Sequence, residues 1–333
     1  GVELTVGEMT AAIGIRRAMC RIRFVLGMAA LGIPAFAAAQ PEGLRPPTDD
    51  CDTMVWNGYF SAWEAVAPAD AQLWIDRFNY DFNRSRREEF VLRGAQDSLR
   101  AAGESSERLI LTDSAGNEAG SLGRRIAFDE ELLARAIAAI DHGIALHPDR
   151  LDMYLGRAAA FAYAERYGRM TDALCALVVR AEANGGRWLA PDGRTVEYVE
   201  PKQLIAGYLQ DYVNRLFEAA SSSDGDAAGE SLGRLARCEV EYCPESVVAL
   251  NNLGAWHYGA GRIDEALDCF VRASAVDPSD GTMLYNIGYL YLRRGDKESA
   301  RTWWRRLLDS PDVDERRRAE ELLREVDGKT AVQ

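Results

Sequence analysis

Apolar residues recur with a helical spacing over most of this chain. Between residues 246 and 313 they fall three or four positions apart in two pairs of short runs. This spacing predicts two pairs of amphipathic helices, neither of which has enough apolar surface to form a core alone. The same spacing over 130–186 extends the prediction of an all-α chain towards the N-terminus.

The residue types in these runs repeat with a period of 34. Seven positions that start at Leu250 reappear 34 residues later, with Pro311 one place early: Leu250, Leu253, Gly254, Ala266, Phe270, Ala273 and Pro278, then Leu284, Ile287, Gly288, Ala300, Trp304, Leu307 and Asp312. The small residues allow two antiparallel helices to approach closely, and proline ends the second helix. This pattern resembles the tetratricopeptide repeat (TPR) family. The resemblance implies a TPR-like solenoid, a right-handed α-α superhelix.

Weaker copies precede these two repeats, as a stable stack requires. Residues 136–148 match a second helix, and 151–186 match a full repeat with about three extra residues in its turn. The predicted order is a signal peptide over 1–39, an N-terminal aromatic helical cap with a β-hairpin insertion over 40–128, degenerate TPR-like helical pairs with a hairpin near 187–199 over 129–245, two tetratricopeptide repeats over 246–313, and a capping helix and tail over 314–333.

Two segments interrupt the helical spacing. Residues 108–128 gather β-forming residues around a Gly, Asn and Ser turn, and 187–199 place Asp192-Gly193 between two short β-prone runs. These features predict two small β-hairpin insertions between helix pairs. Such insertions often shape a binding surface, or they only cover the side of the stack.

The N-terminal residues predict export. A basic stretch over 16–23 precedes an apolar run over 24–36, and alanines at 35, 37 and 39 satisfy an A-x-A cleavage rule. The run contains Gly32 and Pro34 and is shorter than the roughly 20 residues that a membrane span needs. We therefore expect secretion across the inner membrane, a periplasmic location, and no integral membrane segment after signal cleavage.

Charge and cysteine content narrow the possible partners. The formal net charge of −13 disfavours nucleic acid, because an acidic surface repels phosphate backbones. The cysteines that follow the predicted signal have neither CxxC nor metal-ligand spacing: Cys51, Cys175, Cys238, Cys243 and Cys269. We expect structural thiols, with no cofactor and no zinc site.

Catalytic motifs are not evident in the sequence. The histidines His142, His147 and His257 form no HExxH pair, and no nucleophile elbow or phosphate-binding loop is present. An acid and base pair such as Glu197 with Asp211 is conceivable, but nothing selects it from many other carboxylates. The protein is therefore predicted not to be an enzyme.

The family resemblance points to the first helix of each repeat as the partner-binding element. The positions that tend to line the concave groove of such repeats are Val248, Asn251, Asn252, Ala255, Tyr258, Gly259, Thr282, Tyr285, Asn286, Tyr289, Leu292 and Arg293. Asparagines can bond an extended peptide backbone, and tyrosines offer rigid amphipathic contact area. The predicted partner-binding set is Asn251, Asn252, Tyr258, Tyr285, Asn286, Tyr289 and Arg293. Alternatively, Asn252 and Asn286 only tie neighbouring helices together, and the tyrosines are ordinary packing residues.

Three functions remain open on this basis. The first is a non-enzymatic scaffold or adaptor in the cell envelope that binds a protein or peptide through the groove. The second is a glycan or small-ligand binding module that uses the aromatic-rich segment 54–82 and the two hairpins. The third is an enzyme with an unrecognised carboxylate site. Exposed aromatic residues near the hairpins favour the second, and a pocket with convergent acids favours the third.

Overall fold

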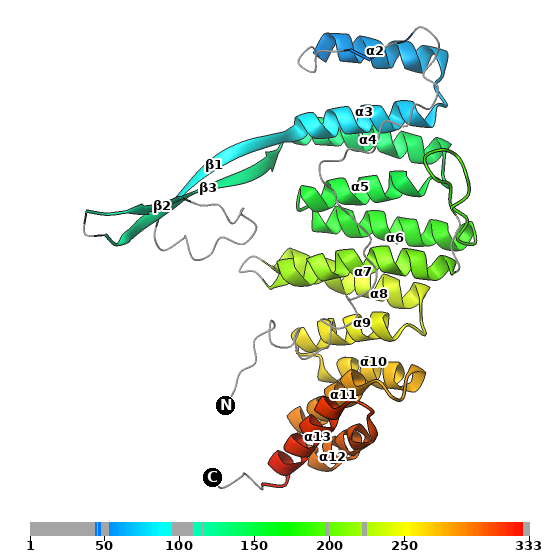
Figure 1. Ribbon diagram of the computed structural model, residues 1–333. Coiled ribbons are helices and arrows are strands. Elements are labelled where there is room, and N and C mark those ends of the chain that lie inside the picture. The colour runs from blue at the N-terminus through cyan, green and yellow to red at the C-terminus, as the bar shows by residue number, and fades with distance from the viewer. Residues whose placement is uncertain are drawn as a thin grey trace. The chain divides into compact units, whose positions relative to one another are not determined.

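The computed structural model describes residues 44, 46–47, 53–94, 109–114, 116–196, 200–221 and 225–328. Figure 1 shows them as antiparallel helices with one β-ribbon, as a helical repeat solenoid with a β insertion requires. The elements are α2 (Thr53–Val66), α3 (Ala71–Ser85), β1 (Arg86–Gly94), β2 (Leu109–Thr112), β3 (Glu118–Phe128), α4 (Glu130–Leu146), α5 (Leu151–Tyr163), α6 (Tyr167–Ala183), α7 (Pro201–Ala220), α8 (Asp226–Tyr242), α9 (Val247–Gly259), α10 (Ile263–Val276), α11 (Gly281–Arg293), α12 (Lys297–Arg306), the 3₁₀ turn η2 (Leu307–Asp309) and α13 (Val313–Val326).

These residues form two compact units. The first unit contains 44–207 with 225–228, and the second contains 208–221 with 229–328. The predicted signal peptide, Cys51 and Glu197 lie outside the described residues. None of the helices in the described ranges is long and apolar enough to cross a membrane.

Three helix pairs share one turn geometry. The pairs α5–α6, α9–α10 and α11–α12 each begin with a helix of 13 residues and continue after a turn of three. The second turn residue has positive φ in every pair, at Glu165, Gly261 and Gly295. The residue after it donates its N–H to a carbonyl five positions back, which satisfies the helix end. The predicted extra residues in the α5–α6 turn are therefore wrong, because α6 is instead longer, with 17 residues against 14 in α10.

Close helix approach explains the repeated glycines. A Cβ atom on Gly254 would lie 2.5 Å from Cε1 of Phe270, and one on Gly288 would lie 2.3 Å from Nε1 of Trp304. Both partner rings are buried, at positions 34 residues apart on the second helix of each pair. The 34-residue alignment is confirmed over this stretch, because in both repeats the glycine faces the ring 16 positions after it.

The first unit has an aromatic core. Aromatic side chains of α2 and α3 pack against apolar residues of α4 in one cluster: Tyr59, Phe60, Trp63, Trp74, Phe78 and Phe82. These rings are at most 7% exposed. These rings form the core of the segment predicted as an aromatic cap, so they are not available to the alternative ligand-binding site over 54–82.

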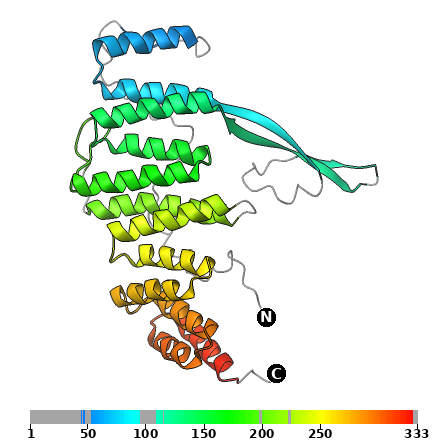
Figure 2. The same ribbon diagram turned by 180° about the vertical axis from the view of Figure 1, so that it is seen from behind.

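The first insertion is a three-stranded antiparallel sheet in the order β1-β3-β2. Figures 1 and 2 both show it extending from the ends of α3 and α4. The strands β2 and β3 were predicted over 108–128, whereas β1 was not. The prediction that this insertion separates helix pairs is wrong, because α3 packs along α4 and the sheet takes the place of the turn within that pair.

The second insertion forms a short hairpin turn in its described residues, 187–196. Its turn has Gly193 at φ 78°, and an antiparallel bridge joins Leu189 to Thr195. Trp188 is fully buried and packs edge-on against Tyr154, with ring centroids 5.7 Å apart. This segment therefore packs onto the first unit by burying its tryptophan, and Trp188 is not available to a partner.

Candidate functional site

Side-chain caps set the register of α9 and α11, the first helices of the two best repeats. Ser246 accepts a hydrogen bond from the N–H of Ala249, and Asp280 accepts one from the N–H of Met283. Capping of this kind satisfies the first free N–H groups of a helix and fixes where it begins. Since both helices have 13 residues, side chains 34 positions apart occupy equivalent places on the two helices.

Three tyrosines connect α9 to α11. The ring of Tyr258 meets that of Tyr289 edge-on with centroids 6.1 Å apart, and Tyr289 stacks on Tyr285 at 6.2 Å. The Tyr258 hydroxyl lies 3.4 Å from the Tyr289 hydroxyl, to which it donates. Burial first and this bond second raise the pKa of Tyr258 to about 12, so it stays neutral at physiological pH. The half-buried rings form a continuous amphipathic row.

Two guanidinium groups flank this row. Arg293 lies at the end of α11 and is close enough to oppose the rise in the Tyr258 pKa. Arg318, on α13, places its guanidinium carbon 3.9 Å from the centroid of the Tyr285 ring. The repeat alignment had identified Arg293 alone. It could not identify Arg318, because the capping helix has no counterpart in the repeat alignment.

The predicted asparagines differ from one another in the structure. Asn252 is 1% exposed, and its amide donates to Gln210 at 2.7 Å and to Glu239 at 3.1 Å. This side chain therefore joins α9 to α7 and α8, and we remove it from the candidate face. Asn251 and Asn286 are 8% and 7% exposed. The Oδ1 atom of Asn251 and the Nδ2 atom of Asn286 are buried without a hydrogen-bond partner.

Besides Gln210, one residue on the preceding helix separates Asn252 from Asn286. Glu239 on α8 accepts from Asn252, whereas the position 34 residues later is Ala273, which has no acceptor. Burial raises the pKa of Glu239 to about 7, and the Asn252 bond acts in the opposite direction. Asn252 thus forms the predicted hydrogen bond between helices. Asn286 has no carboxylate at the equivalent position to accept such a bond.

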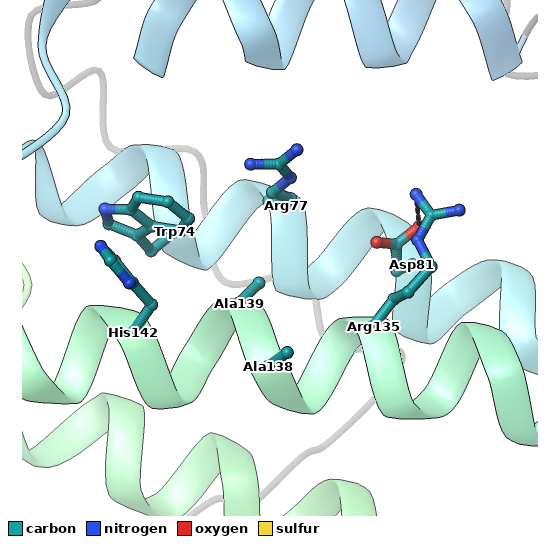
Figure 3. Close-up of a pocket in the computed structure, with 7 residues that line it drawn as sticks. All are labelled: Trp74, Arg77, Asp81, Arg135, Ala138, Ala139 and His142. Atoms are coloured by element: carbon teal, nitrogen blue, oxygen red, sulfur yellow. Dashed lines mark ion pairs between the residues drawn. The ribbon is translucent and has the colours of Figure 1, made fainter. Parts of the chain in front are cut away.

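A second candidate is a pocket of about 260 Å³ along α3 and α4 (Figure 3). Figure 3 shows the rings of Trp74 and His142 side by side, and their centroids are 4.0 Å apart. At the other end, Asp81 pairs with Arg135 at 3.1 Å. Burial raises the pKa of Asp81, and nearby arginines oppose this rise. Arg77 also lines the pocket, but it pairs with Glu64 at 2.8 Å. The charged side chains Arg77, Asp81 and Arg135 of this pocket are therefore all paired within the protein.

The histidines and cysteines take part in packing. The Nδ1 atom of His257 accepts from Arg262, and the Nε2 atom of His147 lies 2.7 Å from the carbonyl of Ala69. In the described part of the chain no group of three His, Cys, Asp or Glu residues could hold a metal ion. The cysteines in the described ranges form no disulfide, and Cys243 lies just beyond the end of α8, the helix that contains Cys238.

Residues 256–315 match the tetratricopeptide repeat family. No curated protein matches the chain. Similar solved structures include YrrB, described as a TPR protein with an unusual peptide-binding site, which is 16% identical, with 79% of this chain and 97% of that chain covered and a TM-score of 0.33. They also include TTC0263, a thermophilic TPR protein in Thermus thermophilus, which is 15% identical with 58% and 92% covered and a TM-score of 0.33.

MamA from Desulfovibrio magneticus RS-1 is another similar structure. It is 11% identical, with 59% of this chain and 88% of that chain covered and a TM-score of 0.29. The family match covers the end of α9 and all of α10, α11 and α12, so this stretch is a tetratricopeptide repeat segment. Repeats of this class generally mediate interactions between proteins, and the fold is typical of non-enzymatic scaffolds.

Proposed function

We propose that this protein is a non-enzymatic adaptor that binds an extended peptide segment on the face formed by α9 and α11. The observation that carries the proposal is the row of Tyr258, Tyr289 and Tyr285, which runs across two consecutive repeats. Half-buried tyrosines of this kind supply contact area at low cost in side-chain entropy. Tyrosine is also one of the residue types that are enriched among interface hot spots.

Asn251 and Asn286 supply polar atoms next to the tyrosine row. A buried polar atom without a hydrogen bond is costly, so such atoms usually have a partner in the functional state. Asn286 offers a donor and Asn251 an acceptor. A peptide backbone presents the matching acceptor and donor at each residue. Because both atoms are buried in the free protein, the side chains that cover them must shift before the two asparagines can fix an extended segment over the tyrosines.

Arg293 and Arg318 suggest the character of that segment. Two guanidinium groups beside an aromatic row favour a peptide with an acidic side chain near its apolar anchor. The repeat alignment by itself offered a single cation on this face, Arg293. Arg318 adds a second cation, so a carboxylate contact becomes part of this proposal.

The proposal also assigns a compartment, the cell envelope. A chain that carries a signal peptide over 1–39 would act as an adaptor in the periplasm. The basic stretch, the apolar run and the alanines described above support export. We place the adaptor in this compartment on that basis.

The two alternative functions receive less support. Most aromatic rings of segment 54–82 are core residues, and Trp188 is buried, so they offer no stacking platform for a sugar. The acids at the α3–α4 pocket and at Glu239 have partners within the protein. Glu197 lies outside the described residues, and Asp211 is on α7.

The test combines peptide selection with a matched set of variants. A displayed library of random peptides is selected on the purified protein, and the best peptide is used in fluorescence anisotropy. Replacement of Tyr285, Asn286 and Tyr289 together by alanine should raise Kd at least tenfold, since each hot-spot aromatic is worth about 2 kcal/mol. The control replaces Arg317 and Arg324, whose ion pairs are confined to α13.

Equal affinity of the triple variant and the wild type would remove this face from the mechanism. A separate Arg318→Ala variant tests the carboxylate contact. This variant should lower the affinity for a selected acidic peptide. It should leave unchanged the affinity for the same peptide in which the acid is replaced by its amide. An equal loss for both peptides would mean that Arg318 only holds the Tyr285 ring in place.

A further inference from the structure

One face of the β-ribbon is apolar and exposed. The register pairs Leu92 of β1 with Leu122 of β3, and Leu122 with Leu109 of β2, so three leucines form a row across the sheet. Phe90 and Leu111 lie on the same face, two residues from Leu92 and Leu109 along their strands. We call this surface the leucine face: Phe90, Leu92, Leu109, Leu111 and Leu122.

The exposure of these side chains is unusual for their type. Phe90 is 73% exposed, Leu92 69% and Leu109 62%, while Leu111 and Leu122 are half-buried. The ribbon meets α3 and α4 at its base, where Arg86 pairs with Phe128, and the leucine face lies further along the strands. A small sheet normally needs packing on its apolar face to be stable.

The opposite face of the ribbon has another composition. It presents Ser121 and Gly123 on the central strand, and an ion pair between Glu89 and Arg125 at 2.8 Å. Ser121 and Gly123 are buried. Ile110, which is 50% exposed, and the half-buried Val91 also lie on this face, but the more exposed apolar side chains, Phe90, Leu92 and Leu109, share the other side of the sheet, as expected for a surface that packs against another one.

We propose that the leucine face packs against the leucine face of a second copy of this chain, in a symmetric dimer. The two ribbons would stack as the layers of a β-sandwich, with the leucine row at the centre. Symmetric pairs bury the same patch on both copies, so a face that is complementary to itself is sufficient.

Charge favours a second copy over a lipid surface. Arg124 pairs with Glu88 at 3.3 Å beside the leucine face, and Arg87 pairs with Asp129 at the base of the ribbon. These arginines are neutralised within the protein, and the chain as a whole carries −13. Anionic lipid would therefore repel it, and the same net charge opposes a second copy, so the dimer must rest on the apolar contact and on local charge pairs. In a symmetric pair, Arg124 of one copy can instead approach Glu88 of the other, so the same charges become complementary.

The size of the face predicts the strength of the dimer. Five apolar side chains with these exposures make a patch of roughly 400 Å², within the range of functional patches on monomers. Two such patches would bury roughly 800 Å² in total, below the standard size of a stable interface. The dimer should therefore be weak and should depend on concentration.

The experiment measures sedimentation of the full chain at protein concentrations from about 1 µM to about 1 mM. This range brackets the dissociation constant expected for an interface of this size. The wild type should pass from monomer to dimer. The double variant Phe90→Ser with Leu92→Ser should raise the dissociation constant at least tenfold. Leu109→Ser, on a different strand, should weaken the dimer independently. The control is Val179→Ser, which changes a 66% exposed valine on α6.

Three results would overturn the proposal. They are a wild type that stays monomeric over the whole range, a double variant that dimerises as well as the wild type, and a Val179→Ser variant that weakens the dimer equally. Flotation with vesicles of phosphatidylglycerol and phosphatidylethanolamine forms a separate arm. Vesicle binding that requires Phe90 and Leu92, by a protein that is otherwise monomeric, would assign the face to lipid and would also refute dimerisation.

Discussion

Replacement of Gly288 by alanine tests the helix packing that aligns the two repeats. The added Cβ would lie 2.3 Å from Nε1 and 2.5 Å from Cδ1 of Trp304, whereas relaxed contacts between heavy atoms are about 3.5–4.0 Å. The indole must therefore move by more than about 1 Å. Trp304 is fully buried and donates to the carbonyl of Tyr285 at 3.2 Å, so this movement strains the core and weakens that bond.

The expected change in unfolding free energy combines two losses and one gain. Overpacking costs about 1–3 kcal/mol. The weakened hydrogen bond costs about 1 kcal/mol more. Alanine recovers up to about 1 kcal/mol through its higher helix propensity. The variant should therefore lose about 1–3 kcal/mol of unfolding free energy. Gly254→Ala should cost less, because the facing Phe270 ring makes no such hydrogen bond and lies 2.5 Å away instead of 2.3 Å.

Denaturant unfolding followed by circular dichroism measures these changes. Gly259→Ala is the control, because a Cβ on Gly259 at the end of α9 meets nothing within 4 Å. Trp304→Leu supplies a double-mutant cycle: with the indole removed, adding Gly288→Ala should cost at least about 1 kcal/mol less than it does in the wild type. Gly288→Ala with wild-type stability, or no coupling to Trp304, would show that the assigned contact is incorrect.

Three further predictions concern a turn, a buried acid and the N-terminus. Glu165→Gly should stabilise the protein by about 0.5 kcal/mol, because glycine tolerates the positive φ at this turn, and Gly261→Ala at the equivalent turn should destabilise it by about 1 kcal/mol. Unfolding free energies measure both, and a loss for Glu165→Gly contradicts the turn comparison. The raised pKa of Glu239, about 7, means that the native state holds its proton between about pH 4.5 and 7 while the unfolded state releases it. Wild-type stability therefore falls over this window, by up to about 3 kcal/mol, relative to Glu239→Gln. Unfolding at pH 5 and pH 8 checks this, and a constant difference between the two proteins excludes it. N-terminal sequencing of the exported protein should find a start between residues 38 and 41, and retention of residues 19–24 would refute the signal peptide.

The candidate site was predictable where the repeat sets the backbone. Tyr285 and Tyr289 lie on α11 with the spacing that the 34-residue alignment assigns, because helices of equal length with equal turns repeat their side-chain positions. Asn252 and Asn286 were equivalent in that alignment. The structure separates them, because Glu239 and Ala273 on the preceding helices offer different partners. A hydrogen bond to another helix is invisible to a comparison of single helices.

The β-ribbon was predictable only in part. The strands β2 and β3 flank a Gly and Asn turn, which is a local signal. The strand β1 is rich in charge and directly follows an amphipathic helix, so its pattern was absorbed into the aromatic cap. Its partner is β3, more than twenty residues away along the chain. Long-range pairing of this kind is decided by the whole sheet and not by the strand alone.

By itself, the sequence determined the helical repeat class, the period of 34 and the small residues at the close helix contacts of the two best repeats. It could do so because the spacing of apolar residues and the need for small residues at close helix contacts are local rules. The tertiary structure decided which polar groups in these helices form hydrogen bonds within the protein and which do not. It buried Asn252 against Glu239, placed Arg318 on the Tyr285 ring, and gathered leucines from three strands on one face. These outcomes depend on contacts between elements, which are set by packing and not by the pattern within any one element.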